Sequence, residues 1–140
     1  MPTLFTRIIE GEILGTFVWR DDRCVAFLSI NPLRRGHTLV VPRMEIDNWI
    51  DCPPELSSHL FTIAGHIGRA LQNAFQPTRV GLMIAGLEVP HMHIHLVPMD
   101  GVHDLDFSNA ADSVDREDLE DAATAIRNEL EAMGLSGAGS

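Results

Sequence analysis

Cysteine is scarce in this chain and is not arranged to bind a metal. The two cysteines, Cys24 and Cys52, form no C-x-x-C pair and do not have the spacing of a zinc site. Cys24 lies in a run that is typical of a β-strand, so we expect it to be a small core residue. We expect both thiols to be reduced.

Long apolar runs and a secretory leader are also lacking. No run approaches the length of a membrane-spanning helix. The N-terminus lacks a basic segment followed by a long apolar one, so we expect no secretory signal and a cytoplasmic location.

Basic residues are outnumbered by acidic ones. Lysine and arginine together number 10 against 20 acidic residues, which gives a formal net charge of −10. This balance argues against a general nucleic-acid-binding surface. It leaves open a local site for one anionic nucleotide.

The chain is nevertheless long and apolar enough to fold. Its 140 residues contain 45% hydrophobic side chains and no internal repeat, which predicts one domain with a proper core. Within it we expect a core over residues 3–98, an acidic loop over 99–113, a helix over about 115–133 and a flexible tail over 134–140.

The most distinctive stretch runs from His91 to Pro98. Its strict alternation predicts a β-strand that places Met92, Ile94 and Leu96 on a buried face. His91, His93 and His95 then lie in a row on the other face, about 7 Å apart at each step.

Three interpretations of this row compete. A histidine-rich solvated face is an unusual choice for a strand exterior. A metal site is disfavoured because the outer pair lies roughly 13 Å apart at the backbone, too far for all three to reach one ion comfortably. Nucleophilic and acid–base chemistry on an anionic group fits the spacing best.

The remaining pattern predicts an α+β fold: a mostly antiparallel five-stranded sheet, one long helix, a short N-terminal helix and a C-terminal helix. Arg34 and Arg35 are expected in solvent, His59 and His66 at the surface, and His103 without a role. The predicted helices span residues 3–10, 55–75 and 115–133, and the predicted strands span 16–19, 24–30, 38–41, 79–85 and 91–97.

The segment His91–Val97 resembles the histidine triad (HIT) signature, in which three histidines alternate with apolar residues. Three further segments, 5–9, 21–27 and 36–42, are similar in order to the Hint-type branch, the purine-nucleotide-binding phosphoramidases. The resemblance covers roughly residues 3 to 98. It implies the HIT-like fold, a homodimer and a purine nucleotide as ligand.

The resemblance also implies a mechanism. His93 would attack phosphorus to form a nucleotidyl-histidine, with His91 and His95 binding phosphate and moving protons and His37 orienting its neighbours. No metal or other cofactor is required. The base would be bracketed by Phe5, Ile8, Phe27 and Ile30.

This chain departs from the branch at positions near the expected phosphate and ribose. Ser29 replaces an aspartate that grips the ribose, and Val80 replaces an asparagine of the phosphate pocket. The segment Gly86-Leu87-Glu88-Val89 replaces Gly-Gln-Ser/Thr-Val. Two functions therefore stay open: a hydrolase or transferase acting on nucleoside phosphoramidates or nucleotidyl phosphoesters, and a nucleotide-binding or interaction protein with little turnover.

Overall fold

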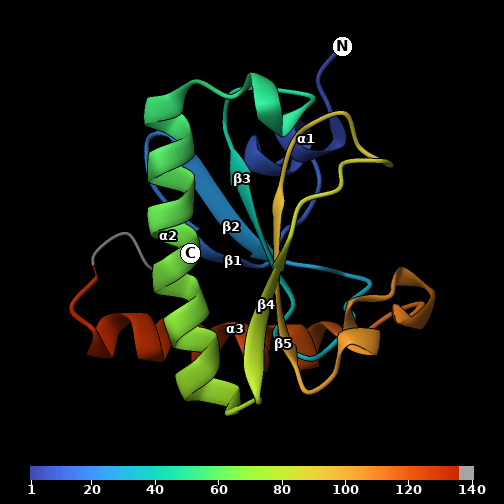
Figure 1. Ribbon diagram of the computed structural model, residues 1–140, viewed down its shortest axis with the longest axis vertical. Helices are drawn as coiled ribbons and strands as arrows, with labels where there is room; N and C mark the ends of the chain where they lie inside the picture. The colour runs from blue at the N-terminus through green and yellow to red at the C-terminus, as the bar shows by residue number, and fades with distance from the viewer. Residues whose placement is uncertain (136–140) are drawn as a thin grey trace.

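The computed structural model describes residues 1–135 and has the predicted α+β architecture (Figure 1). The sheet order is β1-β2-β3-β5-β4, and every neighbouring pair is antiparallel. The strands are β1 (Phe17–Arg20), β2 (Cys24–Leu28), β3 (Thr38–Pro42), β4 (Arg79–Met83) and β5 (Ile94–Met99).

The long helix α2 (Pro54–Phe75) covers one face of the sheet. A proline at its start suits the first helical turn, where a backbone N–H is not needed. Its apolar stripe packs against inward residues of β2, β3 and β5, which forms the main core. The stripe consists of Leu56, Leu60, Ile63, Ala64, Ile67 and Leu71.

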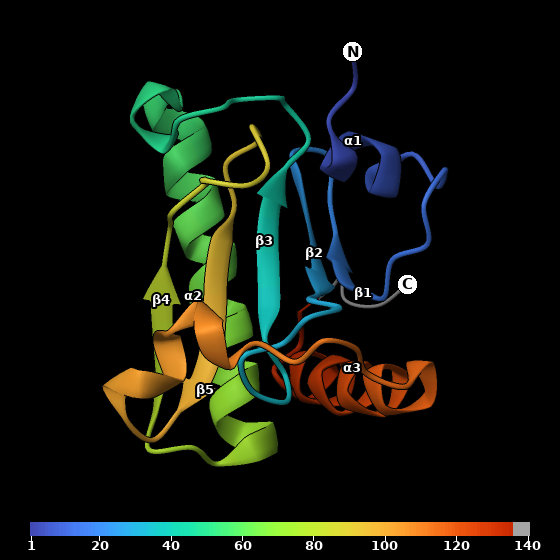
Figure 2. The same ribbon diagram turned by 90° about the vertical axis from the view of Figure 1, so that its right-hand side faces the viewer.

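The C-terminal helix α3 (Arg116–Ala132) lies across the lower end of the sheet and contacts α2 and β1 (Figure 2). Its buried stripe, from Leu119 to Leu130, joins the main core. Leu135 packs against this core and donates its N–H to Leu130, so the predicted tail does not begin at Gly134. Residues 136–140 lie outside the described part of the chain.

The other face of the sheet carries the short helix α1 (Leu4–Ile9) over a smaller, aromatic cluster. The Thr3 hydroxyl caps the helix by accepting from the Thr6 N–H, and the chain leaves it through Gly11 at φ +85°. The buried members of the cluster are Phe5, Phe17, Val25, Phe27, Leu39 and Val41.

Strands β2 and β4 each end two residues earlier than predicted, at Leu28 and Met83, and two further differences lie close to the site. β5 begins at Ile94, because Met92 donates its N–H to Ile46 in the loop after β3 and not to a neighbouring strand. The segment expected as a loop over 99–113 contains two 3₁₀ helices, η2 (Val102–Leu105) and η3 (Phe107–Asn109). A further one, η1 (Trp49–Asp51), precedes α2. Within residues 1–135, no helix has the length and apolarity needed to span a bilayer.

Candidate active site

Four histidines from distant parts of the chain meet on the α1 side of the sheet. His37 precedes β3, His91 and His93 precede β5, and His95 lies within β5. Their exposed fractions are only 0 to 7%. The His95 ring lies 4.7 Å from that of His93 and 5.1 Å from that of His37, centroid to centroid. We call these four residues the triad site.

A chain of hydrogen bonds sets the tautomers of His37 and His95. The Leu33 N–H donates to Nδ1 of His37 at 3.0 Å, so a neutral His37 carries its proton on Nε2. That Nε2 lies 2.9 Å from Nδ1 of His95 and donates to it. A neutral His95 therefore carries its proton on Nε2.

Burial keeps these two rings neutral. Burial, followed by the nearby His93, lowers the pKa of His37 to about 4. Burial, His93 and His37 lower the pKa of His95 to about 3. A second proton on His37 would have to sit on Nδ1, where it would face the Leu33 N–H. A second proton on His95 would have to sit on Nδ1, where it would face the His37 N–H. The pair therefore presents a single N–H, on His95, to the site.

His93 is the opposite tautomer: its proton is on Nδ1 and not on Nε2. Its Nδ1 lies 2.8 Å from the carbonyl oxygen of His91, which can only accept, so Nδ1 carries the proton and Nε2 keeps a lone pair. Burial lowers the pKa of His93, while the hydrogen bond to His91 and the negative charge of Glu88 act in the other direction. The lone pair is thus available at neutral pH.

His91 has no ring nitrogen left for a ligand. Its Nε2 donates to the Pro42 carbonyl at 2.7 Å, and its Nδ1 lies 2.6 Å from the Thr3 hydroxyl. The residue is fully buried. This geometry corrects the expectation that His91 binds phosphate: it positions His93 through its carbonyl.

Two residues that the sequence analysis missed support His91. The Thr3 N–H donates to Oε2 of Glu45 at 2.6 Å, and the Thr6 hydroxyl donates to the same oxygen at 2.8 Å. This network ties α1 to the triad site. Thr3 has a helix-capping signal in the sequence, but no local pattern marks Glu45 as its partner.

Two nitrogens of the triad site remain open. Among residues 1–135, every fully buried side-chain nitrogen or oxygen has a partner, and no protein group bonds Nε2 of His93 or His95. Both atoms must therefore face solvent. They offer a lone pair and an N–H side by side, which suits attack on an electrophile whose oxygens accept the N–H.

An apolar wall adjoins the open nitrogens. The Phe5 ring lies 4.8 Å from the His93 ring and 5.6 Å from the Phe27 ring, edge to face in both cases. Ile8 and Val89 pack on the same cluster, whereas Ile30 is 66% exposed. Phe5 and Phe27 are themselves buried, so the apolar surface that a flat nucleobase could contact is presented by the half-buried Ile8 and Val89.

The residues that were expected near the ribose and the phosphate lie in different parts of the structure. The Ser29 hydroxyl accepts from the Asn31 N–H at 3.2 Å. Leu87 and Glu88 are exposed on the loop between β4 and β5. Val80 packs against the main core on the α2 side, so the expectation that it belongs to the phosphate pocket is wrong. The β4 residue opposite His95 is Met83.

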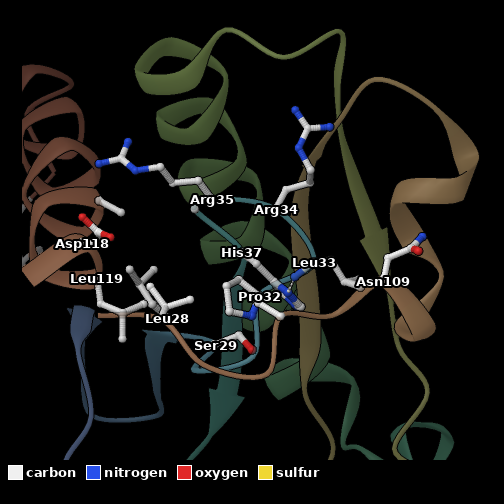
Figure 3. Close-up of a pocket in the computed structure, with 14 residues that line it drawn as sticks. Leu28, Ser29, Pro32, Leu33, Arg34, Arg35, His37, Asn109, Asp118 and Leu119 are labelled. Atoms are coloured by element: carbon white, nitrogen blue, oxygen red, sulfur yellow. Dashed lines mark hydrogen bonds between the residues drawn. The ribbon is translucent and has the colours of Figure 1, made fainter. Parts of the chain in front are cut away.

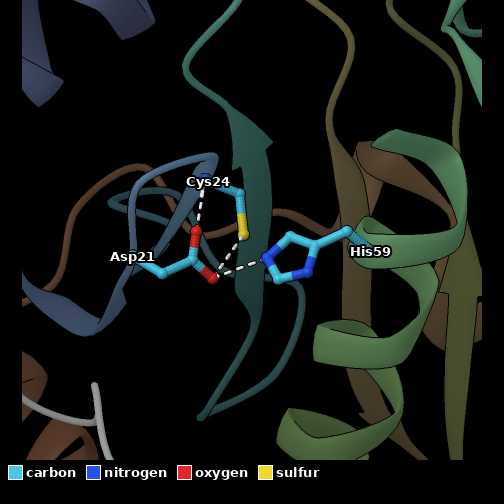
Figure 4. Close-up of side chains that lie close together, drawn as sticks. All are labelled: Asp21, Cys24 and His59. Carbon is cyan, nitrogen blue, oxygen red and sulfur yellow. Dashed lines mark hydrogen bonds and ion pairs between the residues drawn. The ribbon is translucent and has the colours of Figure 1, made fainter. Parts of the chain in front are cut away.

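A second cluster of polar side chains, on the α2 side, joins the turn after β1 to α2 (Figure 4). His59 was expected at the surface, but its side chain is only 17% exposed, and its Nε2 lies 2.7 Å from Oδ2 of Asp21. The buried Cys24 thiol lies 3.5 Å from the same oxygen. We call Asp21, Cys24 and His59 the Asp21 cluster.

The Asp21 cluster has donors that zinc prefers, but its hydrogen bonds do not fit an ion. Arg23, which can only donate, lies 3.0 Å from Nδ1 of His59, so Nε2 of His59 carries the proton and donates to Asp21. Burial and the charge of Asp21 raise the pKa of the Cys24 thiol. An ion bound here would have to displace the protons on Nε2 of His59 and on the Cys24 thiol and break their hydrogen bonds to Asp21. The triad site offers an ion only one free lone pair, on His93.

A cavity of about 430 Å³ lies between the β2–β3 loop and α3 (Figure 3). Ser29 and His37 line its edge, and Arg35 extends toward α3, the helix that carries Asp118. Arg34, which was expected in solvent, has a side chain that is 37% exposed and pairs with Asp104 at 2.7 Å and Asp100 at 3.1 Å. Neither His93 nor His95 lines this cavity, so it is separate from the open nitrogens.

Comparison with known proteins agrees with this geometry. The HIT domain model matches residues 10–102. The protein hit of Bacillus subtilis is 32% identical over 135 residues, which is 91% of this chain and 93% of that protein. A zinc-bound histidine triad protein from Mycobacterium smegmatis has a TM-score of 0.79 at 25% identity and 94% coverage of both chains. The adenylylsulfatase HINT3 of Arabidopsis thaliana is 29% identical over 68% of this chain and 51% of its own length. With its fold, its four histidines and these matches, the chain belongs to the HIT family.

Proposed function

We propose that this protein hydrolyses nucleoside phosphoramidates or related nucleotidyl phosphoesters through a covalent nucleotidyl-histidine on His93. The observation that carries the proposal is the pair of open nitrogens: a lone pair on His93 beside an N–H on His95. A nucleophile next to a fixed hydrogen-bond donor is the arrangement that phosphoryl chemistry needs.

The reaction proceeds in two displacements. Nε2 of His93 forms a bond to phosphorus as the bond from phosphorus to the leaving nitrogen breaks, and the leaving amine takes a proton from water. A second water then attacks phosphorus, releases the nucleoside monophosphate, returns a proton to solvent and restores the lone pair. His95 donates a hydrogen bond to a phosphate oxygen in both steps. Because its ring is held neutral, it supplies this bond and not a net proton.

A purine nucleotide is the ligand class that the surroundings support. Phe5 and Phe27, together with the partly exposed Ile8 and Val89 that pack on them, form an apolar surface beside His93, which supports a base as the group bound there. The activity named for HINT3 also concerns an adenylyl group, so adenylyl sulfate belongs in the substrate panel. No step is assigned to the zinc of the M. smegmatis protein, because neither cluster of this chain presents a suitable set of free donors.

The test combines turnover with detection of the intermediate. Wild type should hydrolyse a panel of adenosine and guanosine phosphoramidates, and mass spectrometry after rapid acid quench should find one nucleotidyl group on His93. His93→Ala should lose both signals. His103→Ala is the matched control, since this exposed histidine lies outside the triad site.

Two results would change the assignment. Undiminished turnover by His93→Ala would rule out the covalent mechanism. Tight nucleotide binding by the wild type without turnover of any panel member would instead support the alternative, a binding protein.

We also propose a homodimer that forms along β4. This strand lies at the edge of the sheet, and both Leu82 and the neighbouring loop residue Leu87 are exposed, by 46% and 93%. Light scattering at micromolar concentration should give twice the 15.5 kDa chain mass. Leu82→Lys should lower that mass toward one chain, and a single-chain mass for the wild type would contradict the dimer.

The cytoplasm remains the proposed location. Its support is the pair of buried, unpaired thiols of Cys24 and Cys52, which suits a reducing compartment. Fractionation of the source cells tests it, and recovery of the protein outside the cytoplasmic fraction would contradict it.

A further inference from the structure

Phe107 lies against the triad site although the sequence analysis gave its segment no role. Its ring lies 5.2 Å from the His95 ring, centroid to centroid, with the two planes at 65°. The side chain is still 46% exposed. A large apolar ring that is half in water beside a polar site is available to contact a ligand.

The segment that carries Phe107 is firmly held. It crosses the lower end of the sheet between β5 and α3 (Figure 2). Asn31 of the β2–β3 loop donates to the carbonyls of Ala111 and Asp112 at 3.1 and 2.8 Å, and Ala111 donates back to Pro32 at 3.0 Å. These bonds attach the segment to the loop whose Leu33 N–H sets the histidine tautomers. Phe107 is therefore a fixed wall.

Within the segment, η3 is closed by its own hydrogen bonds. Oδ1 of Asp106 accepts from the Ser108 N–H at 2.9 Å, and the Asn109 side chain donates to the His103 carbonyl at 2.7 Å. The Phe107 carbonyl accepts from the Ala110 N–H at 3.1 Å. The position of the ring thus depends on backbone and side-chain bonds on both sides of it.

Aromatic rings stand at both ends of the pair of open nitrogens. Phe5 contacts the nucleophile His93, and Phe107 contacts the donor His95. In an in-line displacement the leaving group departs from the side of phosphorus away from the nucleophile. Since the base wall is on the Phe5 side, the Phe107 side remains for the leaving group.

We propose that Phe107 is the wall of a leaving-group subsite and that the protein prefers nucleoside phosphoramidates of amines that carry a flat aromatic group. This inference rests on the proposed function and names its substrate class. The ring of the leaving amine packs on the exposed part of Phe107 while its nitrogen leaves phosphorus and takes a proton from water. Phe107 acts on specificity and does not touch phosphorus.

The experiment compares two adenosine phosphoramidates, one of 2-phenylethylamine and one of 2-cyclohexylethylamine. Both amines carry a six-membered ring on a two-carbon linker, and only the first ring is aromatic. Wild type should favour the phenyl compound in kcat/KM. Phe107→Ala should reduce that preference about three- to tenfold, the size of an aromatic pair interaction. Phe107→Leu keeps an apolar cover on His95 and should also lose the preference, while Phe107→Trp should retain it.

Phe61→Ala is the matched control, because Phe61 is exposed to almost the same degree, 45%, but lies on α2. It should leave the ratio of the two kcat/KM values unchanged. Equal loss for both compounds in Phe107→Ala, or an unchanged ratio in Phe107→Leu, would overturn the subsite and leave the proposed function standing. Failure of the wild type to turn over either compound while it hydrolyses other members of the phosphoramidate panel would also overturn the subsite, whereas failure across the whole panel would overturn the proposed function.

Discussion

The triad site and the Asp21 cluster lie on opposite faces of one sheet. They differ in which histidine ring nitrogens are left without a hydrogen bond. In the Asp21 cluster, both nitrogens of His59 are bonded, one to Asp21 and one to Arg23. In the triad site, His93 and His95 each keep one nitrogen open. Both clusters contain histidine with hydrogen-bonded ring nitrogens, so their chemistry depends on which ring nitrogens stay unpaired.

The comparison also applies inside the triad site. His91 belongs to the signature as much as His93 does, but its ring is bonded on both sides, to Thr3 and Pro42. By the same criterion it resembles His59 and acts as a support. A histidine motif therefore contains residues of two kinds, which only the partners of each nitrogen distinguish.

Within this comparison of the two clusters, the largest expected effect comes from removing the donor that sets the His95 tautomer. His37→Phe keeps a ring of similar size but cannot donate to Nδ1 of His95, so Nε2 of His95 no longer has to carry the proton. We expect kcat to fall on the order of 10²-fold, at the lower end of the range for acid–base groups. His59→Ala in the same assay should leave kcat unchanged. Equal losses in the two variants would show that the clusters do not differ in the way we propose.

A smaller effect, on stability alone, is expected in the Asp21 cluster. His59→Ala removes a hydrogen bond to a half-buried carboxylate and should lower the free energy of unfolding by about 1–3 kcal/mol. Urea titration at pH 7 measures it, with His66→Ala on the same helix as the control. No loss of stability would mean that the cluster is not a tie between the β1–β2 turn and α2.

The two clusters should also lose stability in different pH ranges. The pKa values of His37 and His95 are lowered to about 4 and about 3, below the ordinary 6.5. Their contribution is complete above pH 6.5 and is lost as the pH falls toward those values, because the unfolded chain binds protons that the native site refuses. Burial alone would raise the pKa of Asp21, but hydrogen bonds from Trp19, Arg23, Cys24 and His59 hold it well below its usual range.

The contribution of Asp21 is therefore present above its ordinary pKa of 3.8 and is lost at lower pH. Urea titrations from pH 7 to pH 3 should show a flatter decline above pH 4 in His37→Phe. Asp21→Asn should instead flatten the decline below pH 4. The same profile in both variants would contradict this division.

Much of the fold could be predicted from apolar periodicity. The apolar stripe of α2 was predicted correctly, because side chains three or four residues apart share one face of a helix. The buried face of β5 was also predicted correctly, because every second side chain of a strand lies on the same face. The start of β5 was wrong because alternation continues through His91 and Met92, where the backbone bonds to a loop. Alternation reports which way side chains face and does not report strand pairing.

The site was predictable in its members and less so in their roles. The signature identified His91, His93 and His95, and the resemblance of residues 36–42 added His37. The partners of His91 lie 88 and 49 residues away in the chain, and no local pattern reveals them. The choice of Val80 failed because it came from matching this segment to the Hint-type branch, and that match does not fix which residue of β4 lies opposite His95. Phe107 was missed because its segment is acidic and has no periodicity.

The smallest expected effect concerns Glu88, whose charge acts on the open nitrogen of His93. Burial lowers the pKa of His93 below 6.5, so its lone pair stays available into mildly acidic solution, while Glu88 raises that pKa. Glu88→Gln should therefore move the acidic limb of the kcat/KM profile to lower pH, and more so at low salt, where the charge is less screened. Glu12→Gln is the control and should not move it, because Glu12 follows α1, is exposed and pairs with Arg7. If the acidic limb of the kcat/KM profile of Glu88→Gln lies at the wild-type pH at every salt concentration, Glu88 does not act on the triad site. The contrast between His93 and His59 would then rest on the free lone pair of His93 and not on a nearby charge.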